Sequence, residues 1–193
     1  MIQGDGYMDG LMIIITGASA TGKTVLSKKL GSKLKLSVIN KDEIKELLFD
    51  NLGVKDESWA GKLGVTSFEL CYMFAEKLCN TGKSFILEGN FENRYASKIF
   101  SRLKENYKYR ILQIYCYGQV EVLYDRYISR DNSGERHPGH IISIQNLEQY
   151  KERVNNKDFK LDIDDGKRID LDTTNFELID IEAIYEMINL NYR

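Results

Sequence analysis

The sequence contains Gly17-Ala18-Ser19-Ala20-Thr21-Gly22-Lys23-Thr24, a full match to the pattern G-x-x-x-x-G-K-[ST] of phosphate-binding loops. Its glycines let the backbone curl so that successive N–H groups point at phosphate oxygens. Lys23 supplies a cation for the β- and γ-phosphates of a nucleotide, and the hydroxyl of Thr24 can ligate Mg²⁺. All eight residues are therefore expected to bind the nucleotide.

The segments on either side of this loop support the interpretation. An apolar run at 11–16 precedes the loop and suits a strand buried on both faces of a parallel sheet. The residues at 24–30 follow it with helical spacing of apolar side chains, so a helix is expected to begin near Gly22. The positive end of that helix would face the phosphates. A strand, a glycine loop and a helix in this order are the context that the motif requires.

The rest of the chain alternates between strands and helices. Further strands are expected at 36–40, 84–88, 111–117 and 168–172, and helices at 41–52, 66–79, 95–105 and 179–189. This alternation predicts an α/β fold in three layers with a five-stranded, mostly parallel sheet. Residues 1–10 are expected to form a flexible tail and residues 11–193 one domain. A polar segment at about 126–140 is expected to form a small lid within that domain.

Composition limits the classes of partner. The 27 basic and 29 acidic residues give a formal net charge of -2, so no overall basic field attracts nucleic acid. The longest strongly apolar run, at 11–15, falls far short of the roughly 20 residues that a membrane span needs. Cys71, Cys79 and Cys116 lack metal-ligand spacing and suit buried thiols in a reducing compartment. We therefore expect a cytoplasmic protein that binds neither membranes nor nucleic acid; the oligomeric state stays open.

These features resemble the P-loop kinase branch of the NTPases, especially the group that includes polynucleotide 5′-kinase, the zeta toxins and chloramphenicol phosphotransferase. The resemblance runs from Leu11 to about Asn189, and the phosphate loop is its one highly specific motif. It implies a phosphotransferase that uses ATP and Mg²⁺ and moves the γ-phosphoryl group to a hydroxyl of a small-molecule acceptor. Two alternatives stay open: a 5′-hydroxyl polynucleotide or sugar-nucleotide kinase, and a regulatory ATPase module whose output is conformational.

The resemblance implies that Asp42, just after the strand expected at 36–40, is the general base. A carboxylate near the γ-phosphate can orient and deprotonate an attacking hydroxyl. The alternative is a purely structural role, because acidic residues are also favoured at the start of a helix. Polynucleotide kinases carry an arginine three residues after this aspartate, and the chain has Lys45 there instead. Lys45 is thus a candidate contact of the acceptor.

The remaining candidate contacts follow the ends of expected strands. Glu88 ends the strand at 84–88, where it can hold Mg²⁺ through water or contact the acceptor. Asn90 and Arg94 follow it and are further acceptor candidates. The loop expected at 53–64, together with the region around Asn90, is expected to select the acceptor. Thr173 follows the last strand, where this fold passes the adenine ring.

The expected lid is rich in arginine. By the positions that P-loop kinases use, Arg126 suits stacking on the adenine, whereas Arg130 and Arg136 suit clamping of the transferring phosphoryl group. The alternative is that the first two of these arginines lie on a plain surface helix. His137 and His140, the only histidines, are expected to lie in a polar loop rather than in a metal site.

Overall fold

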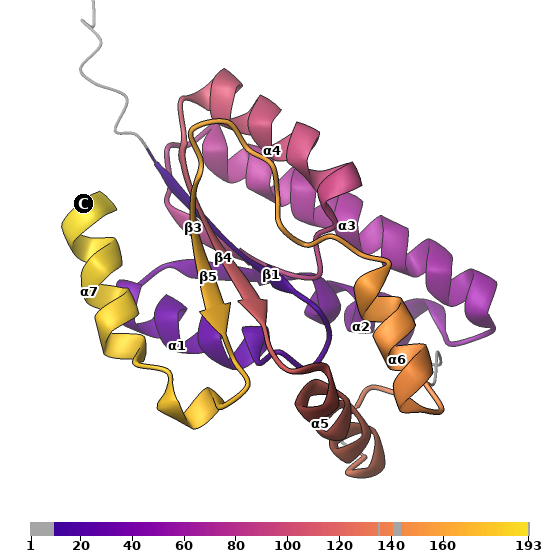
Figure 1. Cartoon of the computed structure of the whole chain (residues 1–193). Coiled ribbons are helices and arrows are strands. Elements are labelled where there is room, and N and C mark those ends of the chain that lie inside the picture. Colours follow the sequence, from indigo (N-terminus) through magenta and orange to yellow (C-terminus); the bar gives the residue numbers. More distant parts are fainter. Residues whose placement is uncertain (1–9, 135, 141–143, 193) are drawn as a thin grey trace, which may run out of the picture.

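A parallel sheet lies at the centre of the computed structural model, which describes residues 10–134, 136–140 and 144–192. Its five strands lie in the order β2 (Ser37–Asn40), β3 (Phe85–Glu88), β1 (Leu11–Gly17), β4 (Arg110–Tyr117) and β5 (Lys167–Asp172) (Figure 1). All four pairs of neighbouring strands are parallel. The expected five-stranded α/β architecture is confirmed. The expected tail lies outside the described residues, except for Gly10.

Helices cover both faces of the sheet and give the fold three layers (Figure 1). In chain order the structure describes α1 (Lys23–Leu34), α2 (Lys41–Leu52), α3 (Glu57–Cys79), α4 (Asn93–Tyr107), α5 (Val120–Asn132), α6 (Leu147–Asn155) and α7 (Ile181–Tyr192), with a 3-10 turn at Phe176–Leu178. Side chains of α3 and α4 pack in one hydrophobic core, and those of α1 and α7 pack in the other.

The apolar run in β1 is explained by these two layers of helices. Met12 and Ile14 belong to the core that contains α3 and α4. Ile13 and Ile15 belong to the opposite core, with α1 and α7. Because successive side chains of a strand point to opposite faces, a strand covered on both sides must be apolar at every position.

The expected bounds fail most at α3, which begins at Glu57 instead of residue 66. The carboxylate of Asp56 caps its first turn by accepting a hydrogen bond of 2.8 Å from a backbone N–H. Gly61 and Gly64 lie inside the helix and weaken its sequence signal, because glycine has a low helix propensity. The expected acceptor-selecting loop at 53–64 is therefore wrong: most of that segment is helical.

The cysteines meet the expectation drawn from their spacing. Cys71, Cys79 and Cys116 are buried free thiols. Burial raises the pKa of each to about 12, so the thiols stay protonated and unreactive. Within the described ranges, no helix has both the length and the apolar character of a membrane span.

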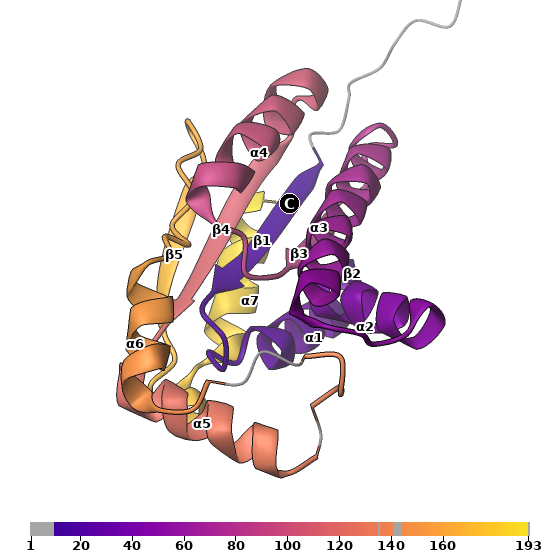
Figure 2. The ribbon, with the colours of Figure 1, turned by 90° about the vertical axis from the view of Figure 1, so that its right-hand side faces the viewer.

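The carboxyl ends of the strands face the segment where the lid was expected. Figure 2 shows α5 and α6 together at that end of the sheet. Residue 135 and residues 141–143 of the connection between these two helices lie outside the described residues. The described part, 136–140, contacts α2 through hydrogen bonds from two histidines. The loop after β1, the start of α2 and this segment therefore surround one region.

Candidate active site

The phosphate-loop residues form a curled turn between β1 and α1. Gly17, Ala20 and Gly22 have φ angles of 145°, 63° and 78°, in the region that favours glycine. A side chain at Gly17 would lie 2.1 Å from a backbone oxygen of β4, so the close approach of the two strands requires glycine there. The hydroxyl of Thr21 donates a hydrogen bond of 2.9 Å to the carbonyl oxygen of Ala18 and holds the turn closed.

Lys23 lies against this turn with its side chain buried. Its Nζ donates a hydrogen bond of 2.6 Å to the carbonyl oxygen of Ala18 and lies 3.4 Å from the hydroxyl of Thr21. Burial lowers the pKa of Lys23, and the negative charges of Glu88 and Asp42 partly offset that effect. The ammonium group is thus held at the loop within the electrostatic reach of both candidate acids.

Thr24 and Glu88 are hydrogen-bonded to each other. The hydroxyl of Thr24 donates to Oε2 of Glu88 at 3.0 Å, and Nδ2 of Asn40 donates to the same oxygen. The register of the sheet creates this cluster, because Asn40 in β2 pairs directly with Glu88 in β3. The Glu88 side chain is only 3% exposed, and burial raises the pKa of its carboxyl group. A hydroxyl and a carboxylate in contact form a donor set that suits Mg²⁺.

Asp42 lies in the first turn of α2, where an acidic residue is favoured, but it is not the cap. The cap is Asn40, whose Oδ1 accepts hydrogen bonds from the backbone of Asp42 at 2.7 Å and of Glu43 at 3.0 Å. The side chain of Asp42 is 56% exposed and lies 3.0 Å from Nζ of Lys41. Lys41 is itself only 7% exposed and lies over the ring of Phe68. The carboxylate of Asp42 is therefore free to meet a ligand on its open side.

The pKa of Asp42 is about 2, which is below its ordinary value. Partial loss of hydration by itself would raise the pKa, but the positive charges of Lys41, His140 and Lys23 outweigh it. Asp42 is therefore ionised at every pH at which the protein would be assayed. The ion pair with Lys41 makes the largest opposing contribution.

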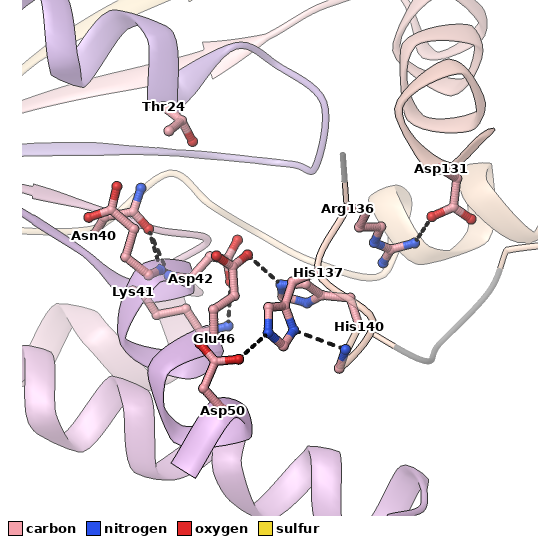
Figure 3. A network of polar contacts seen from close by, with 12 residues as sticks. Thr24, Asn40, Lys41, Asp42, Glu46, Asp50, Asp131, Arg136, His137 and His140 are labelled. Carbon is pink, nitrogen blue, oxygen red and sulfur yellow. Dashed lines mark hydrogen bonds and ion pairs between the residues drawn. The ribbon is translucent and has the colours of Figure 1, made fainter. Parts of the chain in front are cut away.

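The segment 136–140 is attached to α2 at Glu46 and Asp50 (Figure 3). His137 Nε2 lies 3.0 Å from Asp50 Oδ1, and His140 Nε2 lies 3.0 Å from Glu46 Oε1. The ring of His137 stacks on the ring of Phe49, with 5.8 Å between centroids. Because a carboxylate only accepts hydrogen bonds, each Nε2 carries the hydrogen. The segment 136–140 thus covers the second half of α2.

The arginines of this region have different environments. Arg126 donates to the carbonyl oxygens of Thr173 at 2.7 Å and of Thr174 at 2.8 Å, so it fastens α5 to the loop after β5. Arg136 donates to the hydroxyl of Tyr127 at 2.7 Å and forms an ion pair with Asp131. Figure 3 shows this pair at the edge of the segment that carries the two histidines.

These elements enclose a cavity of about 180 Å³ between the phosphate loop, α2, α5 and α6. The cavity brings together most of the residues that the sequence nominated. Those that line it are Ser19, Ala20, Gly22, Lys23, Thr24, Asp42, Lys45, Glu88, Asn90, Arg130 and Arg136. Lys23, the cation expected at the nucleotide, and Asp42, the candidate base, therefore line the same cavity.

Other nominated residues lie away from that lining. Gly17, Ala18 and Thr21 form the body of the phosphate loop behind it. Arg94 is largely exposed and forms an ion pair of 2.9 Å with Glu92, so the structure does not bring it to the cavity. Thr173 is buried and donates to a backbone oxygen of β4, and Arg126 contacts its carbonyl group.

Three polar residues that line the cavity were given no role there by the sequence: Lys41, His140 and Arg153. Lys41 could have been found from its position beside Asp42 at the start of a helix. His140 was expected only in a polar loop. Arg153 lies in α6, which carries no motif of its own, so its position depends on the complete fold.

Comparison with known proteins is consistent with this geometry. The profile of a family described as AAA domain matches residues 12–156. The chain is 32% identical to a candidate kinase of known structure from Chloroflexus aurantiacus J-10-fl, with a TM-score of 0.87 and coverage of 96% of this chain and 100% of that one. No curated protein matches the chain.

Two further solved structures share the fold. A sugar kinase from Janibacter sp. HTCC2649 is 14% identical with a TM-score of 0.57, and the match covers 95% of this chain and 94% of that one. A chain from the PezAT toxin-antitoxin system of Streptococcus pneumoniae is 16% identical with a TM-score of 0.53, over 68% of this chain and 56% of that one.

Proposed function

We propose that this protein transfers the γ-phosphoryl group of ATP to a hydroxyl of a small molecule. The chain belongs to the AAA domain family and to its P-loop kinase group, whose members are phosphotransferases. One observation carries the proposal. Lys23 of the phosphate loop and the carboxylate of Asp42 line the same cavity, and each shifts the pKa of the other. A kinase requires such a pair, with a cation at the transferred phosphate and an acid at the attacking hydroxyl.

The nucleotide side would be served by the phosphate loop and α1. Backbone N–H groups of the curled turn and the start of α1 suit the phosphates of ATP, with Lys23 as the cation nearest the γ-phosphate. Thr24 and Glu88 would hold Mg²⁺, because the hydroxyl of Thr24 is already in contact with the buried carboxylate of Glu88. When bound, the metal would neutralise charge on the β- and γ-phosphates.

On the acceptor side, Asp42 would orient the attacking hydroxyl. The acceptor oxygen forms a bond to the γ-phosphorus while the bond to the bridging oxygen of ADP breaks, and the hydroxyl proton passes to the Asp42 carboxylate. With a pKa of about 2, Asp42 is a weak base that is always ionised. Such a carboxylate aligns the hydroxyl early and accepts its proton late, as a loose transition state permits.

Of the two candidate clamp residues, Arg130 and Arg136, we propose that Arg130 binds the transferring phosphoryl group. Arg136 is already occupied by Asp131 and Tyr127. The guanidinium group of Arg130 has no ion-pair or hydrogen-bond partner among the described residues; Arg130 lines the cavity, and its charge lowers the pKa of Lys23. An unpaired guanidinium near that ammonium group is available for the charge that spreads over the γ-phosphoryl oxygens. The segment 136–140 would act as the lid that excludes water.

Incubation with γ-labelled ATP and Mg²⁺ tests the proposal. Nucleosides, sugars, antibiotics and 5′-hydroxyl oligonucleotides serve as acceptors, and label on the acceptor is the readout. Lys23→Ala should abolish transfer, whereas Lys29→Ala, an exposed lysine of the same helix, should not change it. Hydrolysis of ATP that needs no acceptor and is unchanged in Asp42→Asn would instead indicate a regulatory ATPase. Label on oligonucleotides alone would indicate a polynucleotide kinase.

A further inference from the structure

The cavity has more positive charge than its own acids neutralise. Six cationic side chains line it: Lys23, Lys41, Lys45, Arg130, Arg136 and Arg153. Among the residues that the structure describes, only two carboxylates, those of Asp42 and Glu88, line it as well. Burial raises the pKa of Glu88, which weakens its contribution of negative charge further. An enclosed site with such an excess of cations is built for a ligand with several negative charges.

Four of these cations already have an assignment. Lys23 and Arg130 belong to the phosphate-loop side, since the charge of Arg130 lowers the pKa of Lys23. Lys41 pairs with Asp42, and Arg136 pairs with a carboxylate of α5. The two that remain lie on different elements.

Lys45 and Arg153 are those remaining cations. Within the described ranges, the side chain of neither residue forms an ion pair or a hydrogen bond. Lys45 lies one turn after Lys41 on α2, with its Nζ 5.3 Å from the ring centroid of Phe49. Arg153 enters the cavity lining from α6, on the side of Ser19. The two side chains therefore border the same space from separate helices.

The electrostatics of Lys45 support the view that these charges lack a partner. Burial and the nearby charge of Lys41 lower the pKa of Lys45 to about 8, and Arg153 and Arg136 add to the effect. The single carboxylate that opposes this, Asp42, is already paired. Unpaired cations that destabilise one another in the free protein are stabilised when an anion binds between them.

We infer that the acceptor carries an oxyanion, a carboxylate or a phosphate, and that Lys45 and Arg153 bind it while Asp42 faces the hydroxyl. The inference rests on the proposed function, which it narrows from small molecules to anionic ones. The triphosphate does not need these two cations, because the loop, Lys23 and Arg130 already serve it. An oxyanion bound by Lys45 and Arg153 would present its own hydroxyl group to Asp42, because all three line one cavity.

A transfer assay with matched acceptors tests the inference. The pairs are gluconate with glucose, ribose 5-phosphate with ribose, and adenosine 3′-monophosphate with adenosine. The anionic member of at least one pair should have a kcat/KM about 10- to 100-fold above its neutral partner, as expected for charge-assisted hydrogen bonds. The first pair tests carboxylates and the other two test phosphates. Equal use of both members in every pair that is phosphorylated would overturn the inference.

Variants show whether the two cations cause the preference. Lys45→Gln and Arg153→Gln should raise the KM of the anionic acceptor about 10- to 100-fold and leave the KM of ATP unchanged. Arg153→Lys should keep part of the effect, and Arg102→Gln, on the exposed face of α4, should have none. An equal loss with anionic and neutral acceptors would show that the residues act only through the fold.

A binding measurement separates this inference from the proposed function. Calorimetry with inorganic phosphate is carried out on the protein saturated with a non-hydrolysable ATP analogue and Mg²⁺. We expect one phosphate to bind, with affinity about 10- to 100-fold lower in Lys45→Gln and Arg153→Gln. If no acceptor is ever phosphorylated but this binding is seen, the proposed function fails and the anion site stands. If phosphate does not bind, or binds these variants equally well, the anion site fails.

Discussion

The hydroxyl of Thr24 and the carboxylate of Glu88 form a hydrogen bond of 3.0 Å although 64 residues separate them in the chain. The bond joins the first helix after the phosphate loop to the end of β3. Asn40 at the end of β2 donates to the same carboxylate oxygen. The ends of β2 and β3 and the start of α1 therefore meet at the buried carboxylate of Glu88. Burying this charge should destabilise the fold, and the proposed function uses the carboxylate to bind Mg²⁺.

We predict that Glu88→Gln stabilises the protein and removes Mg²⁺-dependent transfer. Burial raises the pKa of Glu88, so the folded state disfavours its charged form relative to the unfolded chain. An uncharged side chain of the same shape avoids that cost, and the free energy of unfolding should rise by about 0.5–2 kcal/mol. Thermal unfolding measured with and without Mg²⁺ checks the first effect, and the transfer assay checks the second.

The pH dependence makes this prediction specific. A carboxyl group with a raised pKa contributes stability at low pH that is lost as the pH rises through its folded-state value. The free energy of unfolding of the wild type should therefore equal that of Glu88→Gln below the ordinary carboxyl pKa and should be lower than that of the variant near neutral pH. Glu92→Gln is the matched control, because Glu92 is 12% exposed but paired with Lys157 and Arg94, and its loss should destabilise. A difference in the free energy of unfolding between Glu88→Gln and the wild type that does not change with pH would contradict the prediction.

Asp42→Asn should reduce kcat by about 10²- to 10⁴-fold and leave the KM of ATP unchanged, because the residue acts on the acceptor side. Since the pKa of Asp42 is about 2, its ionisation should not appear in the pH–rate profile of the wild type above about pH 4. Steady-state kinetics between pH 4 and pH 8 check both statements. An acidic limb that disappears in Asp42→Asn would show that the carboxylate titrates at a higher pH than the ion pair with Lys41 allows.

Much of the nucleotide side could be predicted from sequence because its determinants are contiguous. The phosphate loop, the strand before it and the helix after it lie within about one βα unit, and the pattern of Lys23 and Thr24 is specific to phosphate binding. Asp42 was nominated as the base from the resemblance to P-loop kinases, and it lines the cavity at the carboxyl ends of the strands, where ligands of parallel sheets bind.

The acceptor side could not be predicted in the same way. The contact of Asn40 with Glu88 depends on the register of β2 and β3, which no local pattern reveals. Arg153 reaches the cavity from a helix without a motif. Arg94 was nominated from its distance after β3, but it instead pairs with Glu92 on the surface. Long-range packing decides these positions, whereas sequence patterns report mainly local geometry.

We predict that acid loosens the attachment of segment 136–140 to α2 through His140. Burial lowers the pKa of His140; Lys45 acts in the same direction, while Asp42 and Glu46 oppose it. A histidine with a lowered pKa favours the folded state when neutral, so the attachment should be strongest above about pH 6.5 and weaken as the pH falls. Hydrogen exchange of 136–140 at pH 7.5 and 5.5, corrected for intrinsic rates, measures this. His140→Gln keeps a donor for Glu46 and should lose the pH response; an unchanged response in that variant would assign the effect elsewhere.

Gly139→Ala should raise the KM of the acceptor without changing the affinity for ATP. A methyl group at Gly139 would lie 2.2 Å from Cδ2 of Phe49, whose ring is 2% exposed and cannot move aside freely. The segment must then shift away from α2, which opens the acceptor side of the cavity and leaves the phosphate loop intact. Gly61→Ala is the control, because nothing lies within 4 Å of the added methyl in α3 and the change should stabilise by about 1 kcal/mol. Equal KM values for the acceptor in the two alanine variants would show that contact between Gly139 and Phe49 does not position the lid.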